Sequence, residues 1–222
     1  MVMSLTGYIG SFQQNLLNDS PDHFKMIRLN SPVVNNTYFQ VIRNLSYKGF
    51  STVILPILFP AAAGEDGLEK AVEQLCQNAE RAVDDGKNYI ILSDRGTNSN
   101  MVPIPSLLAV SAVHHHLINK RKRMQIDIVI ETAEPREVHH FALLFSYGAS
   151  VINPYVAFAI IDRLVNEKII QLDYQKAEEN YMKAINKGLL KILSKMGIST
   201  LRSYRSAQIF EAGGIHESVI NR

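Results

Sequence analysis

The chain is poor in the residues and motifs that most readily reveal chemistry. It has one cysteine, Cys76, and no tryptophan in 222 residues, which excludes an internal disulfide and a cysteine-ligated iron–sulfur centre. Cys76 falls within a helical pattern, so we expect a buried, inert thiol. No apolar run approaches the roughly 18 to 20 residues that cross a bilayer, and the N-terminus lacks the features of a signal peptide. We therefore expect a cytoplasmic protein with no membrane partner.

Common cofactor motifs and a marked excess of charge are also missing. The sequence contains no G-x-G-x-x-G, no P-loop and no G-x-S-x-G motif. The formal net charge is only +2, from 23 basic and 21 acidic residues. The densest basic run, 120–123, suits a solvated helix end better than a phosphate site, because cations are favoured at helix C-termini. We predict no nucleic-acid partner.

What remains is the composition of an ordinary globular protein, with 46% hydrophobic and 20% charged residues. At this length roughly 70% of the unfolded surface can be buried, so a core needs no covalent staples. The first fifty residues carry turn signals but no clear period. We therefore expect an irregular connecting segment over 1–50, lying outside the core, and an α/β domain over 51–222.

Within the second region, apolar strand-like segments alternate with amphipathic helices. We predict strands at 51–59, 88–92, 125–132, 150–153 and 198–201. Helices are predicted near 68–83, from 103 or 105 to 120, and near 135–148, 156–167, 174–196 and 207–212. Pro56 argues for a sheet edge or an early strand end, and Pro135 is expected to open its helix. Strand–helix repeats of this kind give a parallel sheet through right-handed crossovers. About five such units are too few for a closed eight-stranded barrel.

Polar side chains follow three of the predicted strands where parallel sheets commonly bind ligands. The candidate binding residues are Ser93, Asp94, Arg95, Glu131, Glu134 and Asn153, with Thr132 and Tyr155 beside them. An alternative is that Asp94 and Arg95 pair with each other while Glu131 and Glu134 cap a helix start. We favour the capping interpretation and assign no catalytic residue.

Five histidines suggest a metal site, because imidazole is a common zinc ligand. They lie at 114–116, 139 and 140. Three successive helical residues point about 100° apart, so the triplet cannot converge on one ion. His115 continues the stripe of Ile104, Leu108 and Ser111, which favours a packed or hydrogen-bonded histidine. We predict no metal, and a hydrolase would require His115 to meet His139 or His140 across helices.

Several motifs together resemble one family. They are Ile91-Leu-Ser-Asp-Arg-Gly96, Pro103 to Leu117, Glu134 to Phe141, Ser194-Lys-Met-Gly-Ile-Ser-Thr200 and Ser203 to Glu211. With shorter matches near the N-terminus they cover essentially the whole chain, which resembles the central domain of the glutamate synthase large subunit. Ser206 departs from the family pattern, which has glycine there, so a local turn is expected to differ.

The resemblance implies a rudimentary, incomplete form of a flavin-binding barrel. It also implies a structural role between the glutaminase and flavin mononucleotide (FMN) domains of one polypeptide, with a part in shaping the route of ammonia between them. The parent enzymes convert glutamine, 2-oxoglutarate and reductant to two glutamates with FMN and a 3Fe-4S cluster. Their N-terminal cysteine nucleophile and cluster cysteines have no counterparts between Met1 and Arg222. We therefore expect an excised piece with no cofactor of its own.

Two further expectations concern partners. The chain could instead be a stand-alone module that binds a flavin or another phosphate-bearing ligand at its strand ends. Exposed apolar surfaces where the flanking domains would dock could also make it a homo-oligomer. Tyr147, Tyr155 and Phe158 are candidates for such surfaces.

Overall fold

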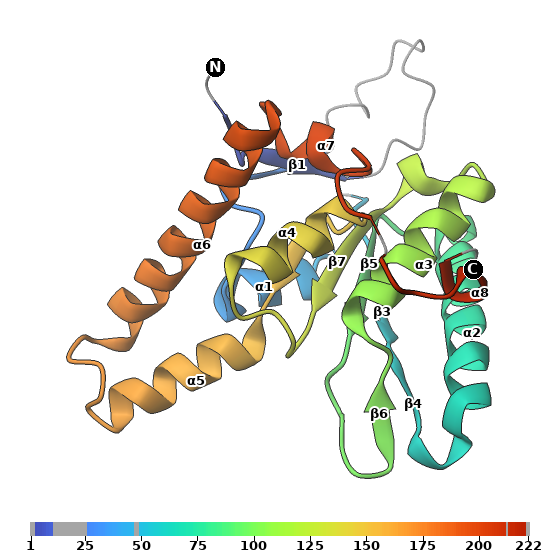
Figure 1. The fold of residues 1–222 in the computed structure, drawn as a ribbon, viewed down its shortest axis with the longest axis horizontal. Coiled ribbons are helices and arrows are strands. Elements are labelled where there is room, and N and C mark those ends of the chain that lie inside the picture. The colour runs from blue at the N-terminus through green and yellow to red at the C-terminus, as the bar shows by residue number, and fades with distance from the viewer. Residues whose placement is uncertain (1–2, 11–25, 47–48, 212, 221–222) are drawn as a thin grey trace.

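A four-stranded parallel sheet forms the centre of the molecule (Figure 1). The computed structural model describes residues 3–10, 26–46, 49–211 and 213–220. The strands, in spatial order, are β3 (Thr52–Pro56), β5 (Tyr89–Ser93), β7 (Asp127–Glu131) and β8 (Val151–Asn153). All three pairings are parallel, which confirms the α/β class and the barrel-like, incomplete architecture. β3 lies at the sheet edge and ends at Pro56, as that proline predicts.

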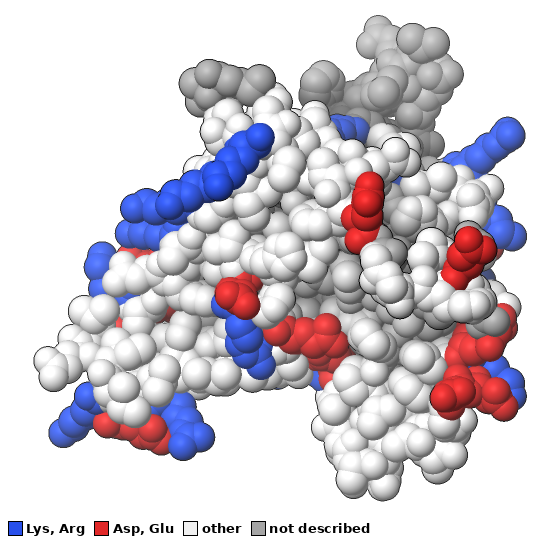
Figure 2. Space-filling view, in the orientation of Figure 1, with Lys and Arg blue, Asp and Glu red and all other residues white. Residues whose placement is uncertain are grey.

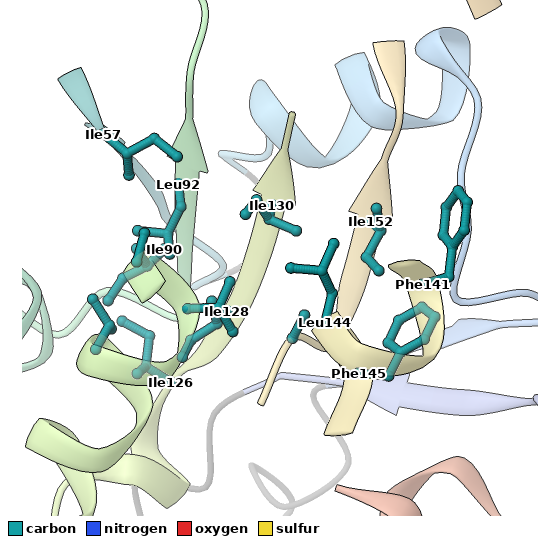
Figure 3. Packing of buried hydrophobic residues seen from close by; sticks show 14 of the residues in the cluster. Ile57, Ile90, Leu92, Ile126, Ile128, Ile130, Phe141, Leu144, Phe145 and Ile152 are labelled. Atoms are coloured by element: carbon teal, nitrogen blue, oxygen red, sulfur yellow. The ribbon is translucent and has the colours of Figure 1, made fainter. Parts of the chain in front are cut away.

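One face of the sheet carries the larger core (Figure 3). Ile90, Leu92, Ile128 and Ile130 point to this face, because alternate strand residues point the same way. Three helices pack against it: α2 (Gly64–Asp84), α3 (Ser106–Asn119) and α4 (Val138–Ser146). These helices and the strands before them agree with the predicted order.

The opposite face is covered by the N-terminal segment. Tyr89, Ile91, Val129 and Val151 form a second core with buried residues from this segment. The covering elements are β1 (Gly7–Ile9), β2 (Ile27–Leu29) and α1 (Asn36–Arg43). Ile9, Phe39 and Ile42 come from these elements, and Val34 comes from the segment before α1. The expectation that this segment stays outside the core is therefore wrong for its described part. The division of the chain at residue 50 stays a prediction.

Two parts extend away from the sheet in Figure 1. Helices α5 (Tyr155–Asn166) and α6 (Tyr174–Met196) form a long hairpin, and α6 also packs on α4. Strands β4 (Leu58–Pro60) and β6 (Met101–Pro103) form an antiparallel ribbon that the sequence did not predict. A short 3₁₀ turn, η2 (Ala61–Ala63), joins β4 to α2. Between α3 and β7 lies a second such turn, η3 (Arg123–Gln125).

Helix ends follow local signals where these are strong. Gly197 takes the left-handed conformation, with φ of 69°, and ends α6 as expected. The helix expected to open at Pro135 begins instead at Val138, because Glu137 and His140 form a capping box around that start.

Two predicted elements near the C-terminus are wrong. Thr200 makes only an isolated parallel bridge to Ser4, and its side chain accepts a hydrogen bond from the Ser203 amide. That cap starts the short helix α7 (Leu201–Tyr204) in place of a fifth strand. No helix forms over 207–210, since Ser206 and Gln208 both have a φ of 55°, in the left-handed region. A last helix, α8 (Glu217–Ile220), comes later.

Candidate functional site

The sequence-predicted residues meet at the carboxyl edge of the sheet, where they form what we call the strand-end cluster. Ser93, Glu131 and Asn153 are direct neighbours in the strand register. All three are buried, as is Asp94. The parallel sheet therefore brings together groups that lie up to 60 positions apart in the sequence, as the carboxyl ends of parallel strands do.

Glu131 is the centre of the cluster. Its carboxylate is fully buried and accepts a hydrogen bond of 2.6 Å from the Ser93 hydroxyl. The Arg95 guanidinium pairs with the other carboxylate oxygen, and Arg43 of α1 lies 3.7 Å away. Arg95 also lies over the Tyr155 ring, 4.0 Å from its centroid. The Arg95 and Arg43 side chains are 46% and 34% exposed, so their guanidinium groups lie between the buried carboxylate and solvent.

Asp94 ties the loops together instead of pairing with Arg95. One of its carboxylate oxygens accepts hydrogen bonds of 2.7 Å from the Thr132 hydroxyl and from the Ala133 amide. The Thr132 hydroxyl in turn lies 2.6 Å from that of Ser106, the first residue of α3. The proposed Asp94–Arg95 pair is therefore wrong, since each residue takes other partners.

Glu134 caps a helix, as the preferred interpretation holds. Both of its carboxylate oxygens lie 3.2 Å from the Ser106 amide at the start of α3, where a negative charge is favoured. The helix is α3 and not the one that follows Glu134 in the chain. Glu131 caps no helix, because its carboxylate forms ion pairs with Arg43 and Arg95. The interpretation that Glu131 caps a helix start is therefore wrong.

Charges of both signs lie at this edge. The carboxylate of Glu131 pairs with two guanidinium groups, whereas those of Asp94 and Glu134 accept hydrogen bonds from neutral donors. Burial raises the pKa of Tyr155 to about 12, and the negative charge of Asp94 adds to the effect. The two buried atoms here that lack a hydrogen-bond partner are oxygens, Asp94 Oδ1 and Asn153 Oδ1.

The histidines take separate partners. His115 is exposed and its Nδ1 lies 2.9 Å from the Ser111 carbonyl oxygen, so it is hydrogen-bonded, as predicted. His139 packs on Phe210, and His140 belongs to the α4 capping box. Within the described ranges no three or more His, Cys, Asp or Glu side chains form a group that could hold a metal. The histidine-ligated hydrolase has no support from these positions.

The other sequence features have structural explanations. Lys120 and Lys122 pair with Glu80, as expected of a solvated helix end. Arg123 departs from that prediction, because its guanidinium turns inward to His114 and to the Gly148 carbonyl. Burial raises the pKa of the Cys76 thiol to about 11, which agrees with an inert thiol. Phe158 is fully buried against Tyr181 and is therefore core, not a docking residue. No helix in the described ranges is long and apolar enough to cross a membrane.

Arg43 is the functional residue that sequence reasoning missed. It lies in the segment expected to be irregular and reaches Glu131 from α1. No local pattern signals a contact between residues so far apart, and only the packing of α1 on the sheet creates it.

A parallel sheet with helices following its strands and polar groups at its carboxyl edge defines this chain as an incomplete α/β barrel-like domain. A mutant flavocytochrome b2 with benzoylformate has a similar fold, with a TM-score of 0.50 and 10% identity over 66% of this chain and 37% of that one. The likeness shows the fold alone.

The family follows from the sequence comparisons. The model of the glutamate synthase central domain matches residues 1–216, and the chain belongs to that family. It is 40% identical over 222 residues to the glutamate synthase [NADPH] large chain of Bacillus subtilis (strain 168), covering 100% of this chain and 14% of the relative. It is 43% identical over 233 residues to the ferredoxin-dependent glutamate synthase of Pyropia yezoensis, covering 100% and 15%. The chain thus spans a small part of the relatives it matches.

The strand-end cluster does not fit the phosphate of a flavin. A phosphate at this edge would face the carboxylates of Asp94, Glu131 and Glu134. The guanidinium groups that could bind it are already placed on Glu131. Its unpartnered buried atoms are acceptors, whereas a phosphate requires donors.

Proposed function

We propose that this chain is the connecting domain of a glutamate synthase, packed between its glutaminase and FMN domains and catalytically silent by itself. The whole polypeptide would convert glutamine, 2-oxoglutarate and reductant to two glutamates, with FMN and the 3Fe-4S cluster held elsewhere. The observation that carries the silent role is the closed strand-end cluster. Glu131 lies where a barrel enzyme would present its ligand groups. Its carboxylate is already bound by the guanidinium groups of Arg43 and Arg95 and by the Ser93 hydroxyl.

Two surfaces support the connecting role. Neither strand of the β4–β6 ribbon contains a charged residue. The residues next to it, 61–63 after β4 and 97–100 before β6, contain none either. Figure 2 shows it as an uncharged projection at the lower end of the molecule. The α5–α6 hairpin exposes Ile160, Ile169 and Leu172, with 65% of Ile169 open to solvent. Uncharged and apolar projections of this kind suit burial against another domain.

The proposed occupants are the flanking domains of the same polypeptide, because the related proteins are about seven times longer than the matched part. In the isolated chain the same surfaces could pair two copies. Light scattering at increasing protein concentration would detect such a homo-oligomer.

The silent role is tested by titrating the purified chain with FMN and following flavin fluorescence, with riboflavin as the control for phosphate dependence. We expect no saturable binding of either. One-to-one binding of FMN at micromolar concentration would contradict the proposal and favour the alternative of a stand-alone flavin-binding module. Glu131→Gln would then be the first variant to examine.

The connecting role is tested in the complete synthase with Val102→Lys on the ribbon. Burying the new charge against a flanking domain is costly, so we expect glutamine hydrolysis to lose its fixed ratio to glutamate formation. Gln77→Lys, an exposed change of the same charge on α2, is the control. Equal behaviour of the two variants would contradict docking through the ribbon.

A further inference from the structure

A pocket of about 660 Å³ opens at the amino end of the sheet, opposite the strand-end cluster. Asp127, the first residue of β7, and Ser150, just before β8, form part of its wall. The rest comes from β1 and β2, from α3 and the segment after it, and from α7 with the residues that follow it. The bridge between Ser4 and Thr200 brings β1 and α7 together here, as the upper part of Figure 1 shows.

Among the described residues, four arginines and one carboxylate line this pocket. They are Arg121, Arg123, Arg202 and Arg205, against Asp127. The oxygens of Asp127 already accept hydrogen bonds from the Ser150 hydroxyl and, at 2.7 Å, from the Gly10 amide. One carboxylate can offset only part of the positive charge of four guanidinium groups.

Arg123 is a structural arginine. Its guanidinium donates to His114 Nδ1 at 2.8 Å, to the Ile126 carbonyl at 2.7 Å and to the Gly148 carbonyl at 2.9 Å. These bonds fix the turn between α3 and β7. They leave Arg123 little capacity for a ligand.

Arg205 differs, because its hydrogen-bonding capacity is incompletely used. Its Nε is buried and has no hydrogen-bond partner, while Nη1 lies 3.7 Å from Asp127 Oδ1, beyond hydrogen-bond distance. A buried, unpaired donor on a charged group is costly unless a ligand satisfies it. Arg121 and Arg202 are exposed and line the same pocket, so an anion at Arg205 would meet further positive charge.

Much of the remaining wall is apolar. It includes Leu5, Ile9, Leu29, Pro32, Ile118 and Met124. A fully hydrated inorganic ion would leave this surface unused, whereas a molecule with an apolar body would bury it.

We propose that this pocket binds a small organic anion, with its carboxylate or phosphate group paired with Arg205 and its apolar body against the wall formed by β1, β2 and the end of α3. The planar guanidinium group matches such oxyanions in a two-point arrangement. This site is separate from the strand-end cluster and does not depend on the connecting role.

The test is a titration of the chain with benzoate, phenyl phosphate, inorganic phosphate and benzyl alcohol, followed by calorimetry or NMR. We expect saturable one-to-one binding of benzoate or phenyl phosphate, and at least tenfold weaker binding of benzyl alcohol and inorganic phosphate. The stronger of the two organic anions identifies the head group. No saturation with either anion, or equal binding of benzyl alcohol, would overturn the proposal.

Variants localise the site. Arg205→Gln is expected to weaken binding of the better anion about tenfold or more, and Arg121→Gln severalfold, whereas Arg163→Gln on the distant helix α5 leaves it unchanged. Circular dichroism establishes that each variant is folded. If Arg205→Gln does not fold, Arg121→Gln decides, because its side chain is exposed. Unchanged affinity in the folded variants would place the anion elsewhere and refute the site.

Discussion

His114 is a buried side chain held in its neutral form. Burial lowers its pKa to about 3, and the neighbouring charge of Arg123 adds to the effect. Nδ1 accepts a hydrogen bond from Arg123, so Nε2 carries the proton and donates to the Ser206 hydroxyl at 2.7 Å. The left-handed turn at Ser206, where the family resemblance predicts glycine, is thereby fixed by the serine side chain.

His114 makes stability depend on pH. Its pKa is lower in the folded chain than the 6.5 of a free histidine, so its contribution is complete above pH 6.5 and is lost as the pH falls toward 3. His114→Gln can keep both hydrogen bonds but does not titrate. In urea unfolding we expect the wild type to lose stability relative to the variant as the pH falls, by about 1.4 kcal/mol for each pH unit below 6.5.

The control for this experiment is Gln77→Asn, an exposed change on α2 that alters no titratable group. The difference in stability between this variant and wild type should stay nearly constant over the same pH range. A constant difference for His114→Gln as well would mean that His114 titrates normally in the folded chain.

Glu131 provides the second prediction at this scale. Glu131→Gln removes the charge that Arg95 and Arg43 face and should destabilise the fold by about 2–3 kcal/mol. The value is below that of a fully buried pair, because both guanidinium groups reach solvent. Urea unfolding measures the loss, and Glu73→Gln on the exposed side of α2 should stay within about 0.5 kcal/mol of wild type. A gain in stability would indicate a strained binding site instead of a structural cluster.

Among the elements, the contact of α4 with α6 depends on one glycine. A Cβ added to Gly188 would lie 2.3 Å from Val138 Cγ2 and 2.7 Å from Cγ1. The absence of a side chain at Gly188 therefore allows α4 and α6 to approach closely. This close contact with α4 holds the α5–α6 hairpin against the rest of the fold.

Gly188→Ala should therefore destabilise the chain by about 1–2 kcal/mol, although alanine favours the helical state by about 1 kcal/mol. Val138→Ala removes the clashing methyl groups. In thermal or urea unfolding, the double variant should be more stable than the sum of the two single effects predicts. Simple additivity would show that the two side chains do not meet.

The sequence predicts elements with strong local signals and misses those that depend on distant contacts. The predicted range of α6, near 174–196, agrees with the observed helix, which Asp173 caps at its start and Gly197 at its end. The β4–β6 ribbon was missed because Leu58–Pro60 and Met101–Pro103 are short, contain prolines and lie about 40 positions apart. Their pairing depends on a contact that no local pattern encodes.

At the scale of the whole molecule, the sheet is buried on both faces. Residues near the N-terminus cover the face formed by Tyr89, Ile91, Val129 and Val151. This second core makes the N-terminal segment part of the folded unit in a physical sense, wherever a domain boundary is drawn.

Removal of residues 1–44 should accordingly expose that apolar face. We expect the truncated chain to bind a hydrophobic dye and to lose cooperative thermal unfolding, because a parallel sheet requires cover on both faces. Truncation before Gly213 is the control, since the described side chains beyond it are exposed. Cooperative unfolding near the wild-type temperature would instead support residues 51–222 as an independent domain.

The sequence by itself determined the α/β class, the order of the main helices and strands, the family, and the group of polar residues at the strand ends. These properties follow from local periodicity, capping residues and motifs, which act over a few positions. Only the tertiary structure decided that Glu131 is closed by Arg43 and Arg95, that the N-terminal segment completes a second core, and that Arg205 faces a pocket at the amino end. Each of these depends on contacts between distant positions, whose free energy exists only when the sheet and its covering layers are assembled.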